Sequence, residues 1–201
     1  MEKGYRVQYL LNFISREYKR CCFHGIESRL LKLQTEATGI PLVQEEVSPD
    51  MQMYEKEFKE AVLRLKDRGI RGMVFGDIYL EEHKSWVERV CKELGIEPIE
   101  PLWGTSTVKD VEDFIDLGFK AVVVSCKADI FNKEFIGRYV DRELLEELKK
   151  KNICPCGENG EFHTFVVDGP IFKKRIEIVK SKTVLKEGFW KYWFLDIKEY
   201  N

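Results

Sequence analysis

Short apolar runs alternate with amphipathic stretches over roughly the first 125 residues. The runs are rich in β-branched and aromatic residues, and each is bounded by glycine, proline or polar residues. The runs predicted as strands are Arg6–Phe13, Ile40–Val43, Gly72–Asp77, Ile96–Ile99 and Phe119–Ser125. The first is apolar on both faces, and Phe119–Ser125 is the clearest buried strand; both features are typical of a parallel strand covered on two sides.

Between these strands, apolar residues recur at helical spacing, and each helical stretch ends at a glycine. The four predicted helices carry Ile26, Leu30, Leu33 and Ala37 before Gly39; Tyr54, Phe58, Ala61, Val62 and Leu65 before Gly69; Trp86, Val90 and Leu94 before Gly95; and Val108, Val111 and Ile115 before Gly118, with capping residues in Thr105 to Thr107. Strands that alternate with helices predict βαβ units, and therefore an α/β fold with a parallel sheet and helices on both faces.

Ligands of parallel α/β sheets bind beyond the carboxyl ends of the strands. Two predicted strand ends carry suitable groups there, Gly76-Asp77 and Trp103-Gly104. For Asp77 two interpretations stay open, contact with a ribose or magnesium ion and a helix cap. His83, beside two glutamates, is expected to be a solvated helix residue.

The pattern changes after Cys126. A helix capped by Asp141 carries Leu144, Leu145 and Leu148, and the tail then alternates in the manner of a strand through Ile176, Ile178, Trp190, Tyr192 and Phe194. We therefore predict an α/β domain over residues 1–126 and a smaller β-rich region over residues 127–201.

Composition narrows the classes of function. The 201 residues are 44% hydrophobic and 34% charged with a net charge of −2, which is typical of a globular protein and gives no field favouring nucleic acid or a membrane surface. No apolar run is long enough to span a bilayer and no signal-peptide pattern is present, so we expect a cytoplasmic protein without nucleic-acid or membrane partners. Without an export signal, the six cysteines are expected to be reduced thiols. Cys154-Pro155-Cys156 lacks the spacer of a zinc knuckle, so we expect no metal site.

The densest polar cluster is Cys156–Pro170. It holds Glu158, Asn159, Glu161, His163 and Thr164 within a few residues, with glycines that permit positive φ at 157 and 160. One interpretation is a ligand site at the mouth of a strand. The other is a glycine turn that leads into a hairpin, with solvated acids and a structural histidine.

The segment Gly157–Phe165, followed by Asp168-Gly169-Pro170, resembles the signature of the diphthine–ammonia ligases. These enzymes are N-type ATP pyrophosphatases of the adenine-nucleotide α-hydrolase-like fold. Shorter segments in the same order are similar to the family as well: Tyr9–Phe13, Phe23–Gly25, Gly39–Leu42, Gly76–Ile78, Pro101–Gly104 and Gly137-Arg138.

The resemblance implies ATP-dependent amidation of diphthine, a modified histidine of elongation factor 2, to diphthamide through an adenylated carboxylate and ammonia. ATP with Mg²⁺ is the implied cofactor, and elongation factor 2 and ammonia are the implied partners. The implied roles are catalysis by Glu158, Glu161 and His163; substrate binding by Asn159, Gly160, Thr164 and Trp103; and nucleotide binding by His24, Gly76, Asp77 and Gly104. The quaternary ammonium of diphthine favours acids and an aromatic face, which Phe162 or Trp103 would supply.

One family feature, the phosphate-binding loop S-G-G-K-D-S with its preceding central strand, is not found in the sequence. We expect the natural chain to begin upstream of Met1, and the strand at Val7–Phe13 to face a gap, a rearranged sheet or a partner such as a second copy. Two alternatives stay open: a related ATP pyrophosphatase with another carboxylate substrate, and a catalytically inactive module that binds elongation factor 2.

Overall fold

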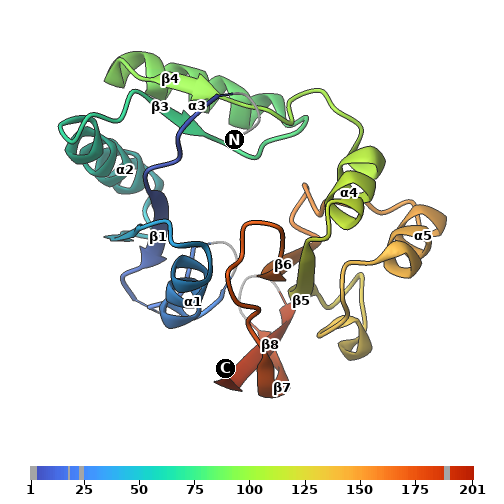
Figure 1. Ribbon diagram of the computed structural model, residues 1–201. Helices are drawn as coiled ribbons and strands as arrows, with labels where there is room; N and C mark the ends of the chain where they lie inside the picture. Colours follow the sequence, from blue (N-terminus) through green and yellow to red (C-terminus); the bar gives the residue numbers. More distant parts are fainter. Residues whose placement is uncertain (1–3, 18, 23–24, 188–190) are drawn as a thin grey trace. The chain divides into compact units, whose positions relative to one another are not determined.

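A computed structural model describes residues 4–17, 19–22, 25–187 and 191–201. The chain forms two compact units that interleave along the sequence (Figure 1). Unit 1 consists of Met1–Cys22 and Pro41–Thr105, and unit 2 consists of Phe23–Ile40 and Ser106–Asn201. Each unit is described by itself below.

The strands of unit 1 form two parallel pairs. β1 (Leu10–Ser15) pairs with β2 (Leu42–Val47), and β3 (Gly72–Val74) pairs with β4 (Glu97–Ile99). The predicted parallel pairing is confirmed for these four strands. β1 begins later than predicted, because Tyr5 to Tyr9 are exposed or half-buried and lie before the pairing with β2.

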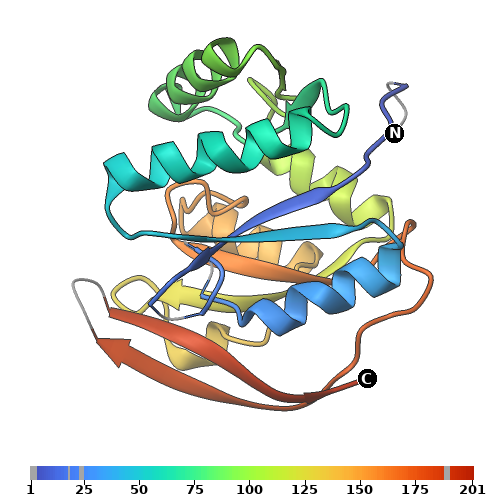
Figure 2. The ribbon, with the colours of Figure 1, turned by 90° about the vertical axis from the view of Figure 1, so that its left-hand side faces the viewer.

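Two helices cover the apolar side chains of unit 1. α2 (Met51–Lys66) runs along the β1–β2 pair (Figure 2), and α3 (Glu81–Leu94) precedes β4. Asp50 caps α2 by accepting hydrogen bonds from the backbone N–H groups of Gln52 and Met53, at 3.0 and 2.9 Å. The buried core of the unit consists of Phe13, Val47, Phe58, Ala61, Val62, Val87, Val90, Cys91, Leu94 and Ile96. The helical stripes predicted from the sequence are therefore the stripes that pack.

Unit 2 contains a four-stranded sheet in which all pairs are antiparallel. Its order is β6 (Phe162–Asp168), β5 (Lys120–Lys127), β8 (Lys191–Tyr200) and β7 (Ile178–Glu187). The placement of β5 in a parallel sheet was wrong. This strand is buried on both faces, as a parallel strand would be, but its partners come from segments that follow it and return in the opposite direction. The strand-like alternation predicted for the C-terminal tail is confirmed by β7 and β8, which pair with each other.

Three helices complete unit 2, α1 (Ser28–Thr38), α4 (Thr107–Asp116) and α5 (Arg142–Lys150), with a short 3₁₀ turn η1 (Lys133–Phe135). α1 is joined to β6 by a hydrogen bond from Gln34 Nε2 to the Val166 carbonyl (2.8 Å), and to the segment that follows β6 by one from the Lys173 N–H to the Ala37 carbonyl (2.7 Å). α5 is capped as predicted, because Asp141 accepts the Leu144 N–H at 2.8 Å.

The structure confirms the α/β class, with parallel pairs in one unit and an antiparallel sheet in the other. The division into a nucleotide-binding and a substrate-binding part stays a prediction. Within the residues that the structure describes, no helix is both long and apolar enough to cross a bilayer.

Candidate functional site

The glycine-glutamate motif of unit 2 forms a closed loop before β6. Gly157 and Gly160 have φ of +66° and +71°, and the Gly160 N–H donates to the Gly157 carbonyl at 2.9 Å. The carboxylate of Glu161 is buried, with 8% of the residue exposed, and it accepts two hydrogen bonds from Asn159, one from the backbone N–H and one from Nδ2, each 3.0 Å long. Glu161 therefore holds Asn159 in place.

Two side chains from distant segments support this loop. Lys127, at the end of β5, donates from Nζ to the Asn159 carbonyl at 3.0 Å, and its backbone N–H donates to the Glu161 carbonyl at 2.9 Å. Tyr192 of β8 donates its hydroxyl to the Gly160 carbonyl at 3.4 Å. The sequence analysis assigned neither residue to the site. The signal that could have indicated Lys127 is its position as a cation close behind an apolar strand.

His163 and Thr164 follow the loop along β6, where successive side chains point to opposite faces of the sheet. His163 lies opposite Ser125, and Thr164 lies opposite Val123, with one extra residue of β5 between these two pairs. The structure thus brings Glu161, Asn159 and Gly160 together but turns His163 and Thr164 to opposite sides. Glu158 is half-buried in the loop itself.

Phe162 lies in the core of unit 2 and is 3% exposed. Its ring meets those of Phe131 and Phe135 edge-on, at centroid distances of 6.0 and 5.6 Å. A buried ring has no free face for a ligand cation, so Phe162 does not supply the aromatic face considered from the sequence. The face of the other candidate, Trp103, holds the protein's own Lys84 ammonium, 4.4 Å from the ring centroid.

Cys156 precedes the loop and donates to the Thr107 carbonyl at 3.4 Å. Burial, followed by the nearby Cys154, Asp110 and Glu158, raises the pKa of the Cys156 thiol to about 12. The thiol is therefore protonated at neutral pH, in the form that is neither a nucleophile nor a metal ligand. Among the described residues, no group of three or more histidine, cysteine or acidic side chains is placed to hold a metal ion.

The second group of candidate residues lies in unit 1, at the carboxyl ends of β3 and β4. The Phe75 N–H donates to the Ile99 carbonyl at 2.9 Å, and the Gly104 N–H donates to the Ile78 carbonyl at 2.8 Å. These bonds bring together the loops that hold Gly76 and Asp77 and those that hold Trp103 and Gly104. We call this group the β3–β4 end: Asp77, His83, Lys84, Glu100 and Trp103.

Asp77 is not a helix cap. The N-cap position of α3 is Leu80, which makes no side-chain cap, and Asp77 instead contacts His83 Nδ1 through Oδ1 at 3.0 Å. His83 is exposed, with 58% of its side chain accessible, as predicted for a helix surface.

The β3–β4 end is rich in acid. Burial raises the pKa of the Glu100 carboxyl above its usual range, with Lys84 lowering it and Asp77 and Glu88 raising it further. Glu100 Oε1 is a buried atom without a hydrogen-bond partner in the described part of the chain. Nucleotide binding by Gly76, Asp77 and Gly104 stays a prediction. His24, the fourth predicted nucleotide-binding residue, lies outside the described residues.

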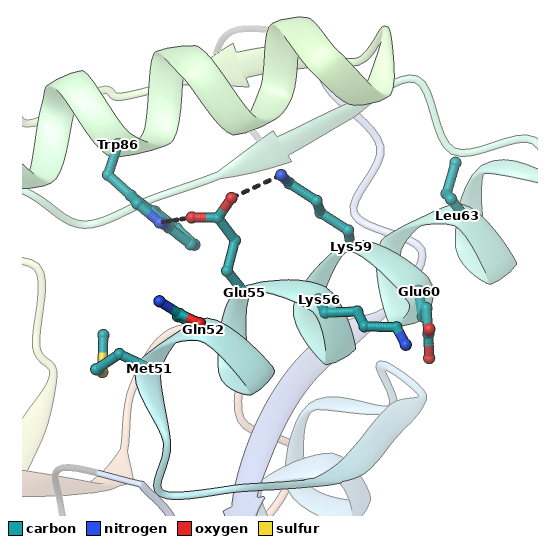
Figure 3. Close-up of a pocket in the computed structure, with 8 residues that line it drawn as sticks. All are labelled: Met51, Gln52, Glu55, Lys56, Lys59, Glu60, Leu63 and Trp86. Carbon is teal, nitrogen blue, oxygen red and sulfur yellow. Dashed lines mark hydrogen bonds and ion pairs between the residues drawn. The ribbon is translucent and has the colours of Figure 1, made fainter.

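A shallow pocket lies along α2 and α3 of unit 1 (Figure 3). It is lined by Met51, Gln52, Glu55, Lys56, Lys59, Glu60, Leu63 and Trp86. Figure 3 shows Glu55 between Trp86 and Lys59: the carboxylate accepts from Trp86 Nε1 at 2.9 Å and from Lys59 Nζ at 2.6 Å. Arg89 donates to both oxygens of Glu55, at 2.9 and 2.7 Å. The central carboxylate is thus engaged by the protein itself, and the network joins two helices.

Two family models match the chain. The diphthamide synthase N-terminal domain matches residues 1–98, and the diphthamide synthase C-terminal domain matches residues 106–201. Together they leave only the linker at 99–105 unmatched.

Curated relatives agree with these matches. A protein from Schizosaccharomyces pombe named diphthine–ammonia ligase is 28% identical over 192 residues, which are 88% of this chain and 32% of that protein. Proteins of the same name from mouse and human are 33% identical over 120 residues and 26% identical over 187 residues; the matches cover 58% and 85% of this chain and 45% and 70% of those proteins. The chain thus spans about a third of the yeast relative and less than half of the mouse relative. The two domain matches and these relatives show that the chain belongs to the diphthamide synthase family.

Proposed function

We propose that this chain takes part in the ATP-dependent conversion of diphthine on elongation factor 2 to diphthamide, as a diphthine–ammonia ligase. The observation that carries the proposal is the pair of family matches, which cover both units with relatives of one name. The buried acid and braced loop at Asn159 support it, because a closed polar loop suits the positioning of a bound substrate.

The proposed reaction has two balanced steps. A carboxylate oxygen of diphthine forms a bond to the α-phosphorus of ATP, and the bond to the leaving pyrophosphate breaks. The nitrogen of ammonia then forms a bond to the activated carbonyl carbon, the bond to AMP breaks, and the nitrogen loses a proton. Adenylation is needed because a free carboxylate is a poor electrophile.

We assign the loop a positioning role and His163 a proton-transfer role in this proposal. Glu161 shapes the loop through Asn159 and does not face a ligand with a free oxygen, since both oxygens accept from Asn159. His163 is the imidazole next to the loop and would take the proton that the attacking nitrogen loses. Lys127 holds the carbonyl of Asn159 and thereby fixes the same loop.

The test is amidation in vitro with diphthine-bearing elongation factor 2, ATP, Mg²⁺ and ammonium. Mass spectrometry would detect the carboxamide, and isotope exchange between ATP and pyrophosphate would report adenylation separately. Amide formation by this chain supports the proposal; neither amide nor exchange, with folded protein and active substrate, refutes it.

Glu161→Gln is the variant that tests the positioning role. We expect a drop in kcat together with a rise in KM for the protein substrate, because Asn159 loses the acceptor pair that orients it. His163→Ala should lower kcat with little change in KM. Glu134→Gln, on the exposed turn η1, is the matched control and should leave both constants unchanged. Unaltered amidation in both test variants would remove these roles.

A further inference from the structure

We propose that the face of the unit 2 sheet that carries His163 docks an acidic surface of the protein substrate, through the exposed side chains of Lys182 and Lys186. We call these two residues the β7 lysines. The inference rests on the proposed function, because it takes the carboxylate of the protein substrate to lie next to His163. It adds a docking surface, and the sign of that surface's charge, to the residues assigned above.

Strand register places His163 and the β7 lysines on one face of the sheet. Residues directly opposite each other in neighbouring strands point to the same face, and so do residues two apart in one strand. One row across the four strands consists of His163, Ser125, Phe194 and Val184. The neighbouring rows consist of Lys127, Tyr192 and Lys186 on one side and of Asp196 and Lys182 on the other. The register shifts of the β7–β8 pair lie outside these rows, between Ile178 and Ser181.

Side-chain contacts agree with this assignment of faces. Lys186 Nζ lies 5.6 Å from the centroid of the Phe194 ring, so the lysine lies over the same row as His163. The alternate residues of β8, Trp193 and Leu195, pack instead against the core cluster that contains Phe162. Because that core closes the other face, a protein that presents its modified side chain to His163 lies over the face of the β7 lysines.

This face has an excess of positive charge. The Lys182 side chain is 62% accessible, and Lys186 is exposed. Asp196 is the only acid among the described residues of the three rows, and its Oδ2 lies 3.9 Å from Lys182 Nζ and 2.9 Å from Lys198 Nζ. Two cations thus share one carboxylate, and Lys186 has an aromatic ring in place of an acid. Electrostatic complementarity then requires an acidic partner surface.

The surrounding segment shows the same excess. Residues 173–201 contain eight lysines and arginines against four acids, although the whole chain has a net charge of −2. The average over the chain therefore conceals a basic region at the C-terminal end of the sequence. An isolated pair of lysines would give a weak field, but this region adds to it.

The spacing and the rings favour a protein over other anionic ligands. The β7 lysines are four residues apart in a strand, which separates their Cα atoms by about 13 Å, too far for one small anion to contact both. A single-stranded nucleic acid uses open aromatic faces to stack its bases. Here a Cβ atom built at Gly25 would lie 2.5 Å from Phe194 Cε1, and the Tyr192 hydroxyl is bonded to the Gly160 carbonyl. The protein itself engages both rings, so an acidic protein surface is the better fit.

The experiment measures the Kd of the full chain for diphthine-bearing elongation factor 2 by isothermal titration calorimetry, without ATP and over a series of NaCl concentrations. We expect the Kd to rise with salt, because salt screens attraction between exposed charges. The same preparations are titrated with poly(U), which tests the nucleic-acid alternative directly.

Charge variants identify the surface. Lys182→Glu/Lys186→Glu should raise the Kd roughly fivefold or more at low salt, because attraction is replaced by repulsion. Lys186→Glu alone leaves the contact of Lys182 with Asp196 intact and should show part of the effect, which guards against misfolding of the double variant. Lys182→Arg/Lys186→Arg keeps the charge and should stay within about twofold of wild type.

The matched control is Lys133→Glu, an equal charge change on the exposed turn η1. Phe135 of this turn packs in the core cluster on the other face of the sheet, so the Kd should not change. In amidation assays the glutamate variants at the β7 lysines should raise KM for the protein substrate with a much smaller effect on kcat.

Four outcomes would overturn the inference: no binding of elongation factor 2, a Kd that does not depend on salt, glutamate variants that bind as wild type does, or arginine variants that lose as much affinity as the glutamate variants. Loss of poly(U) binding with an unchanged Kd for elongation factor 2 would assign the lysines to nucleic acid instead. Binding that depends on the lysines, without amide formation, would refute the proposed function alone. Amide formation with binding that ignores the lysines would refute this surface alone.

Discussion

At the scale of single residues, the loop before β6 depends on two glycines, Gly157 and Gly160, whose backbone conformation disfavours any side chain. Gly157 has a left-handed backbone, and a Cβ atom built there would lie 2.6 Å from the Phe162 carbonyl oxygen. Gly160 is also left-handed, but a Cβ atom there would meet nothing within 4 Å. Substitutions at these two glycines therefore distinguish the cost of a left-handed backbone from the cost of a steric clash.

We predict that Gly157→Ala destabilises the protein by about 3 kcal/mol or more, because strain and a backbone clash act together. Gly160→Ala should cost only about 1 kcal/mol, the price of left-handed backbone alone. Urea unfolding at neutral pH would measure both. Equal costs in the two variants would show that the contact with Phe162 does not constrain the loop.

The identities of the loop residues were predictable because the acids, amide and imidazole stand close together in the sequence. Their partners were not. Lys127 and Tyr192 come from β5 and β8, and Lys84 of α3 meets the Trp103 ring and the charge of Glu100 only in the folded unit. Local patterns name the residues of a loop, whereas the groups that hold it come from strand pairing and helix packing.

At the scale of elements, the helices and the parallel pairs of unit 1 agreed with the prediction from sequence, and the direction of β5 relative to its neighbours did not. Glycine endings located α1 and α3, whose C-caps Gly39 and Gly95 are left-handed. β5 was predicted in position but assigned to the wrong type of sheet. Burial on both faces shows that a strand is covered on both sides, but it does not indicate whether the neighbouring strands are parallel or antiparallel.

The helix pair α2–α3 offers a test of electrostatics between elements. The hydrogen bonds from Arg89, then Lys59, hold the pKa of the Glu55 carboxyl well below its usual range. We predict that Glu55→Gln lowers the free energy of unfolding at pH 7 by about 1 kcal/mol, since the network is partly exposed to solvent. Urea unfolding would measure the loss, with the exposed Glu60→Gln on the same helix as the control.

The effect should depend on pH with a definite sign. A carboxyl whose pKa is lower in the folded chain binds fewer protons there, so its stabilisation is complete above the unfolded pKa of about 4.3 and declines as the pH falls. The difference between wild type and Glu55→Gln should therefore narrow steadily below about pH 4. A difference that stays constant or widens in acid would contradict the ion-pair explanation.

At the scale of the whole molecule, the family's domain boundary and the compact units do not coincide. The N-terminal domain match covers residues 1–98, yet Phe23–Ile40 within it belongs to unit 2. α1 makes hydrogen bonds to the rest of unit 2 through Gln34, Ala37 and Arg29, the last to the Ile197 carbonyl at 3.4 Å. No local pattern in the sequence indicates that α1 belongs to unit 2 while β1 and β2, the strands on either side of it in the sequence, belong to unit 1.

We predict that a fragment of residues 106–201 is less stable than the same fragment joined to residues 25–40 through a flexible linker. Three hydrogen bonds at about 0.5–1.5 kcal/mol each give a difference of roughly 1–4 kcal/mol, before any apolar burial is counted. Chemical denaturation followed by circular dichroism would measure it. Equal stability of the two fragments would show that α1 is dispensable for unit 2.

The interleaved chain path has a consequence for proteolysis. A protease site inserted between Thr105 and Ser106 would cut the last crossing from unit 1 to unit 2, but the N-terminal piece would still carry α1. We expect the two pieces to elute together in size-exclusion chromatography after cleavage and to separate only in denaturant. A nick at this linker would thus cut the backbone while leaving the particle whole.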